Sequence, residues 1–202
     1  MPLTVGEAKG CSHVAYDGVS SERYRFPSGE VWSVVDHWAT SVTGFKAVLL
    51  RSDSKLVLSF AGTDSLLDAV VDLAQVGGSV PPQYHQALIL TMAARRAALG
   101  RVLHLAGHSL GGGLAAYCSV STGLSASTVN PAPLVGAATL RSLRKNAQVT
   151  NYIARGGEFV SSSPGRNPGT DVYVPSTGGT FGFFTDHMLA NVAPAVPLPV
   201  KL

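Results

Sequence analysis

Cysteine is scarce in this chain of 202 residues, which contains only Cys11 and Cys118 and no C-x-x-C motif. Two cysteines neither require nor exclude a disulfide, so they leave the redox compartment open. Charge is scarce too, since Asp, Glu, Lys and Arg make up 13% of the residues and the formal net charge is only +3. Apart from two short clusters the basic residues are scattered, without interleaved aromatics, which argues against a nucleic-acid-binding protein.

Long apolar runs are also missing. The first segment, MPLTVGEAKG, lacks the basic and apolar regions of a signal peptide, and no stretch approaches the length that spans a bilayer. We therefore expect a soluble protein, cytoplasmic at synthesis, with export by another route left open. Hydrophobic residues nevertheless amount to 46%, and no repeat or linker divides the chain, so we expect one domain over residues 1–202.

Predicted strands alternate with predicted helices along most of the chain. Short apolar runs predict strands within 44–62 (two strands around a turn at 51–54) and at 101–107, 126–133, 149–156 and 171–175. Helical spacing of apolar residues predicts helices over 6–17, 64–75, 83–100, 109–121 and 137–147. This alternation predicts a compact α/β fold, with a mostly parallel central sheet, helices on both faces and an antiparallel pair at one edge.

The segment GHSLGGG at residues 107–113 lies between a predicted strand and a predicted helix. Gly107, Ser109 and Gly111 form the pattern G-x-S-x-G, which in this context is typical of a nucleophile elbow, a strained turn that exposes a serine hydroxyl. The alternative is a packing turn of small residues that holds an ordinary serine. Because strand, helix and a third glycine are all in place, we favour the elbow, with Ser109 as the nucleophile.

A serine nucleophile needs a base, and the chain has six histidines. His187 follows the last predicted strand, where the chain order serine, acid, histidine places the base, so we predict that role for His187. His104 lies on a predicted strand and His108 beside the serine, and we expect both to be structural. The remaining histidines, for which no catalytic role is expected, are His13, His37 and His85.

The base needs a carboxylate, and the intermediate needs an oxyanion hole. Glu158 follows a predicted strand and should emerge at the same sheet edge as Ser109, which favours it over the alternative acid, Asp171. The N–H of Leu110 is one predicted oxyanion donor. Thr63, in the segment SFAGTD, is the second, and it also fits a role as the cap of the following helix.

Together these motifs resemble the class 3 lipase family of α/β-hydrolases. The resemblance rests on SFAGTD (59–64), DAVVDLAQ (68–75), AGHSLGGGLA (106–115), TVNPAPLVG (128–136) and GGEFVSSSP (156–164). It implies a triad of Ser109, Glu158 and His187, with Thr63 and Leu110 as oxyanion donors. The chain departs from the family pattern in having Glu where Asp is usual, and Ala61 where arginine is common.

The expected function is that of a serine carboxylester hydrolase: a lipase, a phospholipase A or an esterase that needs neither a metal nor an organic cofactor. Its expected partners are a lipid or small acyl ester and, transiently, a lipid interface; the oligomeric state stays open. In the resemblance, residues 64–75 correspond to a reduced lid, although such an apolar face is more often part of the core. The alternative is a non-catalytic, hydrolase-like binding protein, in which His187 lies out of reach of Ser109.

Overall fold

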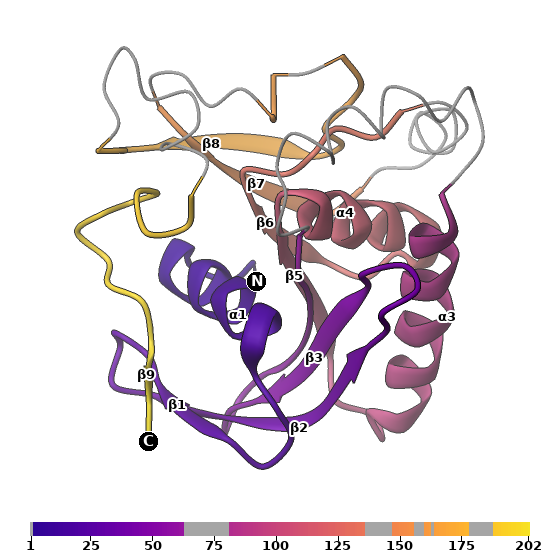
Figure 1. Ribbon diagram of the computed structural model, residues 1–202, viewed down its shortest axis with the longest axis vertical. Coiled ribbons are helices and arrows are strands. Elements are labelled where there is room, and N and C mark those ends of the chain that lie inside the picture. The colour runs from indigo at the N-terminus through magenta and orange to yellow at the C-terminus, as the bar shows by residue number, and fades with distance from the viewer. Residues whose placement is uncertain (1, 63–80, 136–146, 156–159, 163, 178–187) are drawn as a thin grey trace.

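The computed structural model describes residues 2–62, 81–135, 147–155, 160–162, 164–177 and 188–202 (Figure 1). Within these ranges the helices are α1 (Val5–Asp17), α3 (Pro82–Ala97) and α4 (Leu110–Thr122). The strands are β1 (Arg23–Arg25), β2 (Val31–Ala39), β3 (Lys46–Arg51), β4 (Leu56–Phe60), β5 (Leu103–His108), β6 (Ala126–Val129), β7 (Val149–Ala154), β8 (Thr170–Val174) and β9 (Val200–Lys201). The expected helix over 64–75 lies outside the described residues, as does that over 137–147 except for its last residue.

The strands form one mixed sheet in the order β8-β7-β6-β5-β4-β3-β2-β1-β9. Neighbouring strands from β4 to β8 are parallel, and those from β4 through β3, β2 and β1 to β9 are antiparallel. The predicted α/β class is confirmed, but the antiparallel part is wider than the sequence indicated. The predicted antiparallel pair, β3 and β4, lies inside the sheet because β2, β1 and β9 extend it.

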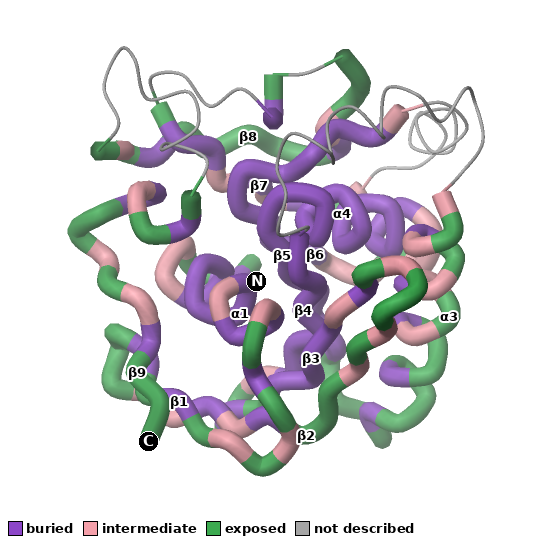
Figure 2. The backbone as a smooth tube through the Cα atoms, in the orientation of Figure 1, coloured by how far each residue is buried: buried purple, intermediate pink, exposed green. Residues whose placement is uncertain are grey.

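Helices cover both faces of the sheet, as predicted (Figure 1). Successive strand residues point to opposite faces. On β4, Leu58 packs in the core under α3 and α4, whereas its neighbour Val57 packs in the core under α1. The central strands are buried along their length, and the outer face of α3 is exposed (Figure 2).

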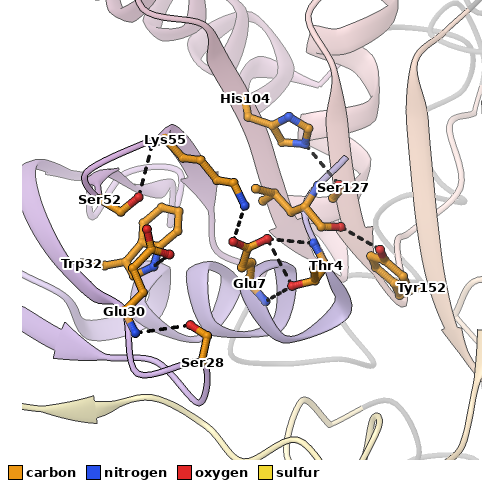
Figure 3. Close-up of polar contacts among 11 residues, drawn as sticks. Thr4, Glu7, Ser28, Glu30, Trp32, Ser52, Lys55, His104, Ser127 and Tyr152 are labelled. Carbon is orange, nitrogen blue, oxygen red and sulfur yellow. Dashed lines mark hydrogen bonds and ion pairs between the residues drawn. The ribbon is translucent and has the colours of Figure 1, made fainter. Parts of the chain in front are cut away.

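Helix α1 is fixed to the sheet at its first turn (Figure 3). Thr4 and Glu7 form a capping box, in which Thr4 N–H donates to the Glu7 carboxylate at 2.9 Å, and Glu7 also pairs with Lys55. Leu3 N–H donates to Ser127 Oγ on β6 at 3.1 Å. The Leu3 carbonyl accepts a 2.7 Å hydrogen bond from the Tyr152 hydroxyl on β7. These contacts fix the direction in which the rest of α1 crosses the sheet.

The two cysteines are free and buried on opposite sides of the sheet, Cys11 on α1 and Cys118 on α4. Burial raises the pKa of both thiols, the Cys118 pKa to about 12, so neither thiol is ionised near neutral pH. With the sheet between the two cysteines, the disulfide that the sequence left open is not formed. None of the described helices is long and apolar enough to cross a bilayer.

Candidate active site

Ser109 is the single residue between the end of β5 and the start of α4, and its backbone conformation is strained. Its φ of 57° and ψ of −128° are sparsely populated for residues other than glycine. Three hydrogen bonds hold it there. Its N–H donates to the Val129 carbonyl at 3.2 Å, and its carbonyl accepts from Ala132 N–H at 2.8 Å and from Gly113 N–H at 3.1 Å. The fold thus imposes the sharp turn that the sequence predicted.

The glycines on either side of Ser109 are required by sterics. A Cβ at Gly107 would lie 2.2 Å from the carbonyl oxygen of Gly111. A Cβ at Gly111 would lie 2.1 Å from the carbonyl oxygen of Phe60, at the end of β4. Both obstacles are backbone atoms, which cannot rotate away. The G-x-S-x-G pattern therefore allows the first turn of α4 to pack directly against β5 and β4.

The chain leaving β4 runs beside the nucleophile. A Cβ on Gly62 would lie 2.9 Å from the Cβ of Ser109, so only glycine permits this approach. Thr63, the predicted oxyanion donor, is the next residue in the sequence and lies outside the described part of the chain. Leu110, the other predicted donor, is the first residue of α4. The N–H groups of a first helical turn have no acceptor within the helix and lie at the positive end of its dipole.

The two histidines near the elbow are buried and hydrogen-bonded, as expected of structural residues. His108 Nδ1 lies 2.8 Å from the hydroxyl of Tyr16 on α1. His104 Nε2 lies 3.1 Å from Ser127 Oγ (Figure 3), and burial lowers the pKa of His104 to about 4. The sequence offered no signal for Tyr16, because its place at the site depends on how α1 packs.

Of the two carboxylates weighed as the triad acid, the structure describes Asp171 alone; Glu158 and the predicted base His187 lie outside the described ranges. The Asp171 carboxylate accepts a 2.9 Å hydrogen bond from Asn151 Nδ2. Asp171 lies on β8, the third strand from β5, which corresponds to roughly 14 Å at the usual strand spacing. Its described partner thus ties Asp171 to the sheet rather than to the elbow.

Described residues on either side of positions 158 and 187 in the sequence meet at one end of the sheet. Arg155, directly after β7, accepts a 2.8 Å hydrogen bond on its carbonyl from Ser176 Oγ. Ser176 in turn pairs with Val192 in an isolated antiparallel bridge. Leu189, two residues after His187 in the sequence, is buried in the core under α1. The segments that lead to Glu158 and away from His187 are therefore neighbours.

A strained serine between a parallel strand and a helix, in a sheet covered on both faces, is the arrangement typical of the α/β-hydrolase fold. The fold is similar to that of the Rhizomucor miehei lipase propeptide complex, with a TM-score of 0.68 and 14% identity over 94% of this chain and 80% of that one. It is also similar to a triacylglycerol lipase from Penicillium expansum, with a TM-score of 0.60 and 17% identity over 90% and 84% of the chains.

A family assignment follows from the sequence comparisons. The model of the Phospholipase-like family, described as a Tle-like phospholipase domain, matches residues 24–161, and the chain belongs to this family. The extracellular phospholipase A1 of Serratia liquefaciens is 43% identical over 90 residues, which are 45% of this chain and 28% of that protein. The matched part thus spans little more than a quarter of this relative's length. Family and fold together confirm the resemblance to lipases.

Within the described residues no group of three or more His, Cys, Asp or Glu side chains is placed to hold a metal ion.

Proposed function

We propose that this chain hydrolyses carboxylic esters of lipids, with phospholipids as its main substrates, through an acyl-enzyme on Ser109. The observation that carries the proposal is the strained Ser109 elbow with Gly62 packed against it, in a chain of the Phospholipase-like family. The Serratia relative is named a phospholipase A1, which supports the ester at the first carbon of glycerol as the bond cleaved.

In the proposed mechanism, His187 takes the proton of Ser109 while the hydroxyl oxygen attacks the ester carbonyl. The N–H groups of Leu110 and Thr63 stabilise the oxyanion of the tetrahedral intermediate. His187 then protonates the departing alcohol, here a lysophospholipid. Water, activated by the same histidine, releases the fatty acid from Ser109. Glu158 holds the imidazole in the required tautomer and stabilises its charged form.

The choice of Glu158 as acid is supported by topology. It lies a few residues after β7, the second strand from β5, and parallel strands place the residues that follow them at one edge of the sheet. Asp171 lies within β8, one strand further away, and its carboxylate is bonded to Asn151. Asn151 Oδ1 accepts in turn from Thr128 at 2.7 Å. The described partner of the exposed Asp171 carboxylate is therefore a residue of the sheet and not a histidine.

The first experiment is labelling with a fluorophosphonate, which reacts with activated serines, followed by peptide mapping. We expect one adduct, on Ser109, and none in Ser109→Ala or His187→Ala. Ser119→Ala is the matched control. Ser119 is buried as Ser109 is, but it lies within α4 and its hydroxyl donates to the Leu124 carbonyl, so the Ser119→Ala protein should label as the wild type does. If the wild-type protein forms no adduct, even with phospholipid micelles present, the enzyme proposal is wrong and the lipid-binding alternative replaces it.

A second comparison decides the acid and the substrate. Glu158→Ala should label slowly and Asp171→Ala at the wild-type rate; the reverse result would move the acid to Asp171. The substrate panel contains phospholipids with a distinguishable acyl chain at either glycerol position, a triacylglycerol and a short-chain ester. We expect fatty acid from the first position of the phospholipid. Faster release from triacylglycerol would make the protein a neutral lipase instead.

A further inference from the structure

The hydroxyl of Tyr16, in the last turn of α1, joins the two backbone segments that form the site. It accepts a 3.2 Å hydrogen bond from Gly62 N–H and lies 2.8 Å from Nδ1 of His108. Gly62 directly precedes Thr63, and His108 directly precedes Ser109 and Leu110. One hydroxyl therefore contacts both segments that carry the predicted oxyanion donors.

The Tyr16 hydroxyl has one proton and two lone pairs, so a single oxygen can bind both neighbours. It accepts from Gly62 N–H, and its contact with His108 Nδ1 is a hydrogen bond in either tautomer of the ring: the hydroxyl donates when the ring proton is on Nε2 and accepts when that proton is on Nδ1. Gly62, Tyr16 and His108 therefore form one connected chain.

Packing leaves little freedom in this arrangement. A Cβ on Gly62 would lie 2.8 Å from the Tyr16 hydroxyl and 3.0 Å from the His108 carbonyl oxygen, so these atoms fill the space into which a side chain at position 62 would project. The Tyr16 and His108 rings lie 6.1 Å apart between centroids, tilted by 54°. Since the opposite end of α1 is bonded to β6 and β7, Tyr16 extends from a fixed support.

We propose that Tyr16 is a positioning residue for the oxyanion hole. By binding Gly62 N–H and the His108 ring through one hydroxyl, it fixes the Ala61–Gly62 peptide beside His108, and so fixes the two segments that lead to the predicted donors Thr63 and Leu110. The role rests on the proposed ester hydrolysis. Because the oxyanion forms only during reaction, the loss of the Tyr16 hydroxyl should lower kcat more than it changes KM.

The test compares Tyr16→Phe, which keeps the ring and removes the hydroxyl, with Tyr24→Phe. Tyr24 also makes a partly buried hydroxyl contact, a 2.7 Å bond to Glu22, but on β1, near the far edge of the sheet. Each protein is titrated with a fluorophosphonate, so that kcat is expressed per reactive Ser109 and any misfolded fraction is excluded. We expect Tyr16→Phe to lose about tenfold in kcat, the value of one hydrogen bond, with KM unchanged, and Tyr24→Phe to match the wild type.

A direct readout accompanies the kinetics: amide hydrogen exchange at Gly62, which should speed up in Tyr16→Phe and not in Tyr24→Phe. Ser109→Ala in the same series separates the two proposals. If the wild type hydrolyses no more ester than Ser109→Ala does, the proposed function fails and the role of Tyr16 with it. If Ser109→Ala is inactive but Tyr16→Phe keeps the wild-type kcat per titrated site, the function stands and the Tyr16 proposal is overturned.

Discussion

At the scale of single residues, the site depends on a serine in a conformation that suits glycine better. Holding a non-glycine residue at such angles costs about 1–3 kcal/mol, which the surrounding hydrogen bonds offset. We predict that Ser109→Gly is more stable than Ser109→Ala by about 1 kcal/mol, because only glycine relieves the strain at a φ of 57°. Neither variant carries the hydroxyl, so the difference between their free energies of unfolding in urea reports the backbone strain at position 109.

The same pair of substitutions at Ser119 serves as the control. Ser119 lies within α4, where glycine costs about 1 kcal/mol relative to alanine, so here the alanine variant should be the more stable. The order of stability should therefore reverse between the two positions. If Ser109→Ala proves at least as stable as Ser109→Gly, the elbow is not strained.

A second residue-scale prediction concerns Gly111. Its missing side chain allows α4 to approach the end of β4, and an added Cβ would lie 2.1 Å from the Phe60 carbonyl oxygen. We predict that Gly111→Ala lowers the free energy of unfolding by about 3 kcal/mol, since backbone must shift on both sides. Gly100→Ala is the control: its Cβ meets open space, and only the cost of a φ of +85° applies, about 1 kcal/mol. Equal costs in thermal or urea unfolding would contradict the packing argument.

At the scale of elements, the parts that the sequence predicted well are those with strong local signals. The apolar run and the glycine pattern around Ser109 predicted a strand at 101–107 and a helix from 109, and the structure has β5 at Leu103–His108 and α4 from Leu110. Five parallel strands, with α3 and α4 between the first three of them, produce such signals repeatedly. The predicted helix over 83–100 ends at Ala97, two residues before Leu99, whose positive φ ends the helical path.

The elements that the sequence missed have weak local signals. Strand β2 alternates between inward and outward residues only in its first half, and a bulge between Val34 and Asp36 interrupts the register. Strands β1 and β9 contain three and two residues, too few for a periodic pattern. Tyr16 was missed for a different reason: its function at the site depends on the packing of α1, which no local pattern encodes.

An element-scale prediction concerns Lys9, a buried lysine on α1. Its ammonium donates to the carbonyls of Val192 at 2.7 Å and Val196 at 2.8 Å, and so fixes the segment that follows position 187. Burial lowers the pKa of Lys9, as expected where desolvation opposes the charged form. We predict that Lys9→Met lowers the free energy of unfolding by about 2–4 kcal/mol, because buried carbonyls lose their donor.

Lys55→Met is the matched control for this effect. Lys55 pairs with Glu7 at the same helix, but its side chain is 36% exposed, so its loss should cost at most about 1 kcal/mol. Chemical unfolding of both variants distinguishes the two sites. Similar small costs would show that the Lys9 contacts contribute little to holding this segment in place.

At the scale of the whole molecule, the site is assembled from three layers. The sheet aligns β4, β5 and β6 so that the residues after them meet, α4 packs from one face to complete the elbow, and α1 packs from the other to hold Gly62 and His108. Unfolding of any one layer should therefore abolish activity together with structure. The joint stability of the sheet and α1 therefore determines under which solution conditions the site is folded.

The buried His104 makes that stability dependent on pH. It lies on β5 with its Nε2 against Ser127 Oγ, which already accepts from Leu3 N–H, so the hydroxyl proton fits an unprotonated Nε2. Burial, and less strongly the charge of Lys55, lower the His104 pKa from 6.5 to about 4. Between these values the unfolded chain binds a proton that the folded protein does not. The free energy of unfolding must therefore fall as the pH falls from 7 toward 4.

We predict that acidification from pH 7 to pH 4.5 removes about 2 kcal/mol of stability through this one group, measured by urea unfolding at each pH. His13, whose pKa is also lowered by burial, contributes in the same direction, so the wild type alone does not isolate His104. His104→Gln does: it should be less stable at pH 7, yet lose about 2 kcal/mol less than the wild type over the same range. Parallel pH profiles for the two proteins would mean that His104 accepts its proton as readily in the folded state as in the unfolded chain. In that case the protonated His104 ring keeps a hydrogen bond to Ser127 by donating from Nε2, and the loss of stability in acid comes from other groups.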